Sequence, residues 1–100
     1  MENNKKIIDL KLSTQRALLG MIYPEIRAIA IGFLNGKKIK IIMYLDKTPE
    51  EFDNENLKEI TSEILSDIPE IEEFDEQCVY SNEIINKLDC LDFLAYARKE

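Results

Sequence analysis

Residues 27–45 constrain the fold most, because two alternating β-branched runs flank an Asn35-Gly36 pair. An Asn-Gly pair between two such runs is the strongest short-range indication of a β-hairpin. A two-residue turn would mix isoleucine with lysine on each face. A three-residue loop at 34–36, with a bulge and Gly36 in the left-handed conformation, pairs Phe33 with Lys37 instead. In this register the apolar odd-numbered residues share one face and the lysines Lys38 and Lys40 lie on the other. We therefore predict the bulged loop and a core face made of odd-numbered residues: Ile29, Ile31, Phe33, Ile39, Ile41 and Met43.

The opposite face of this hairpin carries small and apolar side chains together with two lysines. Its residues are Ala28, Ala30, Gly32, Lys38, Lys40, Ile42 and Tyr44. A face of this kind can meet another sheet or helix, so a homo-oligomer formed through it is possible.

An amphipathic helix follows the hairpin. Thr48 can cap it, Pro49 suits the first helical position, and Glu51 completes a capping box. Pro69 ends it. Its apolar residues recur at helical spacing and should pack on the odd-numbered face of the hairpin: Leu57, Ile60, Thr61, Ile64, Leu65 and Ile68.

The remaining segments complete an α+β domain. We expect residues 1–10 to be frayed, and a first helix over 15–22, capped by Ser13 or Thr14 and ended by Pro24. Strands are predicted at 72–80 and 91–98, and 81–90 is either a loop or a short helical turn. The predicted order is αββαββ, an antiparallel four-stranded sheet with two helices packed on one face, in a single domain of residues 1–100.

The chain lacks the residues that the common catalytic, phosphate-binding and metal sites require. The chain has no histidine, its three glycines stand apart, and two separated cysteines supply too few ligands for zinc. We expect no catalytic residue, no metal and no cofactor. A pair of carboxylates in unlike environments is the remaining catalytic alternative. Cys78 and Cys90 are read as reduced, buried small hydrophobes, with a disulfide between them as the alternative. The three arginines are expected in structural ion pairs: Arg16, Arg27 and Arg98.

The net charge of −7 limits the partners of the chain. An acidic protein repels nucleic acid and anionic membranes and attracts basic proteins. No apolar run approaches the roughly 20 residues of a membrane span, and an early aspartate argues against a signal peptide. We expect a cytoplasmic protein that binds neither nucleic acid nor membrane.

Two acidic groups are candidate partner-binding residues, although a merely solvated surface is the simpler alternative for both. The first is a stripe along one side of the predicted helix, formed by Phe52, Glu55, Glu59 and Glu63. The second precedes and enters the third strand, beside Phe74 and Tyr80: Glu70, Glu72, Glu73, Asp75 and Glu76. Carboxylates around an aromatic anchor suit a basic nuclease toxin, because they would take the place of the RNA backbone.

Two stretches support a family resemblance. Residues 13–28, read as Ser-Thr-Gln-Arg-Ala-Leu-Leu-Gly-Met-Ile-Tyr-Pro-Glu-Ile-Arg-Ala, and the ending Tyr-Ala-Arg-Lys-Glu at 96–100 resemble small bacterial immunity proteins. Those proteins belong to polymorphic toxin systems such as contact-dependent growth inhibition. The resemblance implies a non-catalytic protein that binds and neutralises a cognate toxin. A small structural, adaptor or self-associating module is the alternative.

Overall fold

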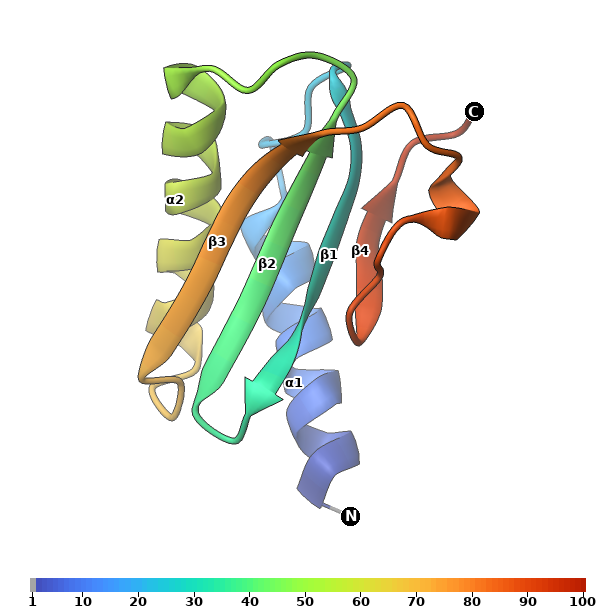
Figure 1. Cartoon of the computed structure of the whole chain (residues 1–100). Helices are drawn as coiled ribbons and strands as arrows, with labels where there is room; N and C mark the ends of the chain where they lie inside the picture. Colours follow the sequence, from blue (N-terminus) through green and yellow to red (C-terminus); the bar gives the residue numbers. More distant parts are fainter. Residues whose placement is uncertain (1) are drawn as a thin grey trace.

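The computed structural model describes residues 2–100, and side chains from residue 5 onward. The chain forms two helices and a four-stranded sheet. Figure 1 shows the helices behind the sheet. This arrangement confirms the predicted α+β fold and its αββαββ order, with one short 3-10 turn, η1, before the last strand. The elements are α1 (Glu2–Ala17), β1 (Ile26–Asn35), β2 (Lys38–Leu45), α2 (Glu51–Asp67), β3 (Glu73–Tyr80), η1 (Ile85–Lys87) and β4 (Phe93–Ala97).

The sheet is mixed, so the prediction of a purely antiparallel sheet is wrong. Its strand order is β3-β2-β1-β4. The β1/β2 and β1/β4 pairs are antiparallel, whereas β2 and β3 are parallel. The cause is the helix between β2 and β3, because α2 carries the chain back along the sheet before the next strand begins. A strand–helix–strand unit of this kind places its two strands side by side in the same direction.

The hairpin keeps the predicted faces but differs from the predicted register by two residues. Phe33 pairs with Ile39 rather than Lys37, and a bulge lies between Phe33 and Asn35. The turn itself has two residues, and Gly36 is not left-handed, contrary to the prediction. The Asn35 side chain accounts for this turn, because its Oδ1 accepts the N–H groups of Lys37 and Lys38 at 2.8 and 2.9 Å.

The core lies between the odd-numbered face of the hairpin and the two helices. Ile29, Ile31, Ile39, Ile41 and Met43 are fully buried there, and Phe33 is partly buried at the edge. The predicted stripe of α2 packs on this face, with four members buried and Leu65 and Ile68 at its margin. Residues of α1 join the same core, so both helices cover one face, as predicted.

The first helix begins and ends earlier than predicted. Residues 2–10 are helical rather than frayed, and Met1 lies outside the described residues. Leu10 is fully buried and anchors this part of the helix. The two expected caps lie inside the helix: the Thr14 hydroxyl donates to the Leu10 carbonyl at 2.6 Å, and the Ser13 hydroxyl donates to Asp67 at 2.9 Å.

The second helix begins two residues later than predicted, at Glu51 rather than Pro49. Glu50, not Thr48, is the N-cap residue. The carboxylate that binds the N-cap N–H belongs to Asp53, at 2.8 Å, and not to Glu51. A buried Asp53 is held by other segments as well, and this tertiary contact selects it over its exposed neighbour.

The second face of the hairpin is covered by the chain itself. Ala28, Ala30, Ile42 and Tyr44 are buried against Val79, Leu88, Leu91 and Leu94. The chain passes so close to Gly32 that a Cβ there would lie 2.7 Å from the Asp92 nitrogen. The expected self-association surface is therefore occupied in the folded chain, while the oligomeric state stays a prediction.

The two cysteines differ from each other. Both are free thiols; Cys78 is partly buried against the core, whereas Cys90 is exposed. The expectation that both are buried is wrong for Cys90, because the segment around it runs along the surface of the sheet rather than through the core.

Candidate functional site

The first acidic group lies on the exposed side of α2. Phe52, Glu55, Glu59 and Glu63 are all exposed. Phe52 is 63% exposed but has the neighbour that its position requires, because its ring centroid lies 5.4 Å from that of Tyr23. These four residues therefore form a surface that a partner can reach, which we call the helix surface.

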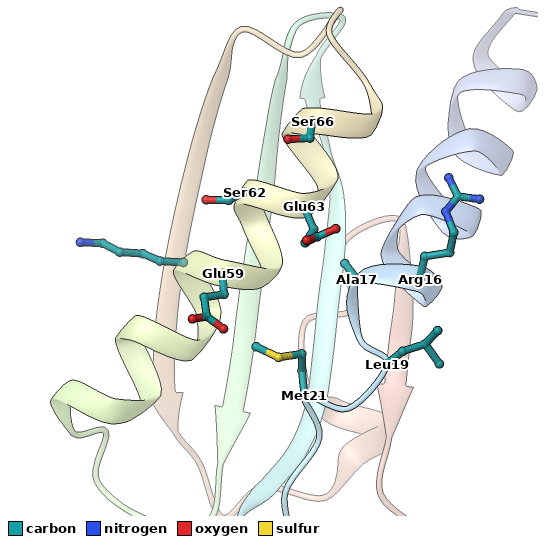
Figure 2. A pocket seen from close by; sticks show the side chains of 9 residues that line it. Arg16, Ala17, Leu19, Met21, Glu59, Ser62, Glu63 and Ser66 are labelled. Atoms are coloured by element: carbon teal, nitrogen blue, oxygen red, sulfur yellow. The ribbon is translucent and has the colours of Figure 1, made fainter.

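A groove of about 500 Å³ runs along the helix surface, between α2 and the chain that leaves α1. Figure 2 shows Glu59 and Glu63 on its α2 side and Ala17, Leu19 and Met21 opposite them. Leu19 is 79% exposed. The sequence interpretation did not connect Leu19 or Met21 with this groove, because it placed both in a helix that in fact ends at Ala17. Met21 is partly buried against the core, as well as lining the groove.

The groove is lined by two cations, Arg16 and Lys58, and by two carboxylates, Glu59 and Glu63. Arg16 is paired with Asp67 at 2.8 Å, and this contact lowers the pKa of the Asp67 carboxyl. Glu59 and Glu63 take part in no ion pair among the residues described. Two free carboxylates beside apolar side chains can receive a long basic side chain, whose aliphatic stem covers the apolar part.

A buried polar cluster holds the beginning of α2, and with it Phe52, in place. Asp53 is fully buried and accepts hydrogen bonds from the Tyr23 hydroxyl and the Lys47 ammonium group. Burial alone would raise the pKa of Asp53, but these bonds and that of the Glu50 N–H outweigh it, so the pKa is lowered. Asp53 is thus ionised at neutral pH and ties Tyr23 and Lys47 to the beginning of α2.

The second acidic group surrounds the open edge of the sheet at β3, and we call it the edge surface. It consists of Glu70, Glu72, Glu73, Asp75 and Glu76, and all but the partly buried Glu76 are exposed. In register, Glu73 lies beside Lys38 and Asp75 beside Lys40. Glu72 lies 3.4 Å from Lys37. Lys37 and the two lysines of β2 therefore offset part of this negative charge.

Glu76 lies on the other face of β3 and is bound to α2, because the Thr61 hydroxyl donates to its carboxylate. The structure therefore divides the edge surface, with Glu73 and Asp75 on the face away from the helices and Glu76 on the helix side. It also keeps the edge surface apart from the groove, since the side of α2 that holds Glu76 faces β3 while Glu59 and Glu63 border α1.

The arginines make structural ion pairs, as predicted. The Arg27 guanidinium donates to both carboxylate oxygens of Glu100, at 2.6 and 2.8 Å. These bonds lower the pKa of Glu100 to about 2. Arg98 donates to Asp46 at 2.7 Å and to the Pro24 carbonyl at 2.6 Å. The two stretches that support the family resemblance thus meet at Arg27 and Glu100 and join β4 to β1.

Among the side chains of residues 5–100, no three acidic, cysteine or histidine groups lie close enough together to hold a metal ion. None of the helices within residues 2–100 combines the length and apolar character of a membrane span.

A family model described as MafI2 immunity protein matches residues 7–100. No curated protein matches the chain.

Proposed function

Because the chain belongs to the MafI2 immunity protein family, we propose that it binds a cognate antibacterial toxin and neutralises it without catalysis. The family match over residues 7–100 is the observation that carries this proposal. The protein would act in the cytoplasm of the cell that makes it, where a nuclease toxin finds its substrate.

We further propose that the toxin is a basic nuclease, as in a contact-dependent growth inhibition system. The net charge of −7 and the two exposed acidic surfaces support this assignment. Nucleases present lysine and arginine side chains to the nucleic acid backbone, and a carboxylate-rich protein competes for them and is attracted at long range.

Co-expression with the neighbouring upstream open reading frame tests the proposed function. We expect that gene alone to stop growth, growth to be restored by this protein, and the purified toxin to degrade nucleic acid until one equivalent of the protein is added. A neighbour that is no toxin, or toxicity that persists in the presence of the protein, would show that the proposal is wrong.

Two double substitutions test which surface binds the toxin. Glu59→Lys with Glu63→Lys alters the helix surface, and Glu73→Lys with Asp75→Lys alters the edge surface. Each pair changes the net charge by the same amount, so a difference between them reports local contacts rather than the overall field. We expect both to weaken toxin binding. The helix pair should leave the free energy of unfolding within about 0.5 kcal/mol of the parent. The edge pair places lysines beside Lys38 and Lys40 and should lower it by up to about 1 kcal/mol at each position.

The outcomes of this comparison are separable. Unchanged affinity after Glu59→Lys with Glu63→Lys would confine the interface to residues 70–76. Unchanged affinity in both variants would refute an acidic interface.

A further inference from the structure

The free edge of β3 has a defined hydrogen-bonding pattern. β3 is the first strand of the order β3-β2-β1-β4, so no strand lies beyond it within residues 2–100 (Figure 1). The Glu73 N–H donates to the Lys37 carbonyl and the Ser81 N–H to the Leu45 carbonyl, both at 3.1 Å. Glu72, just before β3, also donates its N–H to the Lys37 carbonyl, at 2.8 Å. In a parallel pair, every second residue of a strand directs both its N–H and its C=O to the neighbouring strand. The odd-numbered residues of β3 therefore bind β2.

The even-numbered residues of β3 consequently direct their backbone N–H and C=O groups away from the sheet. These residues are Phe74, Glu76, Cys78 and Tyr80. All eight residues of β3 are in continuous register with β2, from Lys38 beside Glu73 to Leu45 beside Tyr80. The opposite edge, β4, has only five residues and pairs irregularly with β1. Of the two edges, β3 is the long and regular one, which is the kind that accepts another strand.

The side chains along this edge indicate what kind of strand fits. On the helix side, Phe74 and Tyr80 are 46% and 51% exposed and leave apolar surface beside the edge. On the other side are the exposed carboxylates of Glu73 and Asp75. A strand with apolar side chains on one face and basic side chains on the other would match both sides, since opposite charges on neighbouring strands attract and like charges repel.

A second copy of this chain does not have those properties. It would bring a second set of carboxylates to the same edge, and two molecules of charge −7 would approach each other. Charged edge residues commonly prevent strands of the same protein from pairing.

We infer that β3 is a receptor strand: an extended segment of the toxin, with alternating basic and apolar side chains, adds to its free edge as a fifth strand. This inference rests on the proposed function and specifies how the edge surface binds. Main-chain hydrogen bonds to the four even-numbered residues would hold the strand, and the alternating side chains would select it.

Amide hydrogen exchange tests this inference directly. The probe is the toxin encoded by the upstream open reading frame, carrying an inactivating substitution, added to the ¹⁵N-labelled protein. We expect exchange of the Glu76 and Cys78 amides to slow at least tenfold in the complex. The amides of Asp75 and Gln77, already bonded to β2, should change much less.

A matched pair of variants gives a second measurement. Glu76→Ala and Glu76→Pro both remove the carboxylate and its bond from Thr61, but only Glu76→Pro removes the outward N–H. Since that N–H does not bind β2, both variants should fold, and their thermal unfolding is compared as the control. We expect Glu76→Pro to bind the toxin roughly two- to tenfold more weakly than Glu76→Ala, the loss that corresponds to one hydrogen bond.

The results distinguish this inference from the proposed function. A toxin that binds and is neutralised while the even-numbered amides of β3 stay unprotected would overturn the receptor strand alone. Protection of these amides in a dimer of the free protein would also overturn it, since a second copy would then be the occupant. A toxin that fails to bind at all would overturn the proposed function itself.

Discussion

The replacement Asp53→Ala should be among the most destabilising changes at any polar residue of this chain. Asp53 is fully buried, and three groups depend on it: the Glu50 N–H at the start of α2, the Tyr23 hydroxyl and the Lys47 ammonium group. Alanine leaves the Glu50 N–H and the Tyr23 hydroxyl without their acceptor, whereas Lys47 keeps its contact with the Glu50 carboxylate at 3.5 Å.

The expected loss can be worked out from these contacts. Losing the N-terminal capping bond costs about 1 kcal/mol. Leaving the partly buried Tyr23 hydroxyl without its acceptor adds about 1 to 3 kcal/mol. We expect the free energy of unfolding to fall by about 2 to 4 kcal/mol in total, which for a chain of this size lowers the Tm by roughly 10 to 25 °C.

Urea unfolding followed by circular dichroism at pH 7 measures the loss. Tyr23→Phe removes one of the three partners and should cost less than Asp53→Ala. Glu55→Ala replaces an exposed acid of the same helix and should stay within about 0.5 kcal/mol of the parent. A loss below about 1 kcal/mol for Asp53→Ala would refute the argument, because it would mean that the cluster adds nothing beyond its capping bond.

Three further changes probe other parts of the fold. Gly32→Ala should cost about 1 to 3 kcal/mol in urea unfolding, because its Cβ would lie 2.7 Å from the backbone nitrogen of Asp92; an unchanged midpoint would show that the chain moves aside freely. Ile41→Ala removes a fully buried side chain between sheet and helices and should cost about 2 to 5 kcal/mol by the same measurement. Glu100→Gln should lower the Tm at pH 7. The pKa of Glu100 is lowered from 4.5 to about 2 in the folded protein, so its contribution is full above the unfolded pKa and is lost as pH falls toward 2. The Tm curves of parent and variant should therefore converge below pH 4, and a constant difference down to pH 2 would contradict the ion pair with Arg27.

Much of the candidate site followed from local patterns. The exposed position of Glu59 and Glu63 is a consequence of the helical period, because the apolar stripe of α2 must face the sheet. The strand nature of the acidic residues after Glu72 was likewise predicted, and the strand begins at Glu73. The groove was not predicted, since it depends on where α1 ends and on how close α1 lies to α2.

The sequence by itself determined the order of the elements, the core face of the hairpin and the buried stripe of α2, because each depends on a period of 2 or 3.6 residues that is written in neighbouring positions. Only the tertiary structure decided the parallel pairing of β3 with β2, the covering of the second hairpin face and the contact of Arg27 with Glu100, which are 73 residues apart. Contacts of that kind depend on how whole helices and strands pack, so the spacing of residues within one segment does not predict them. The free edge of β3 belongs to this second group, since it exists only because β3 lies outside β2 and has no neighbour of its own.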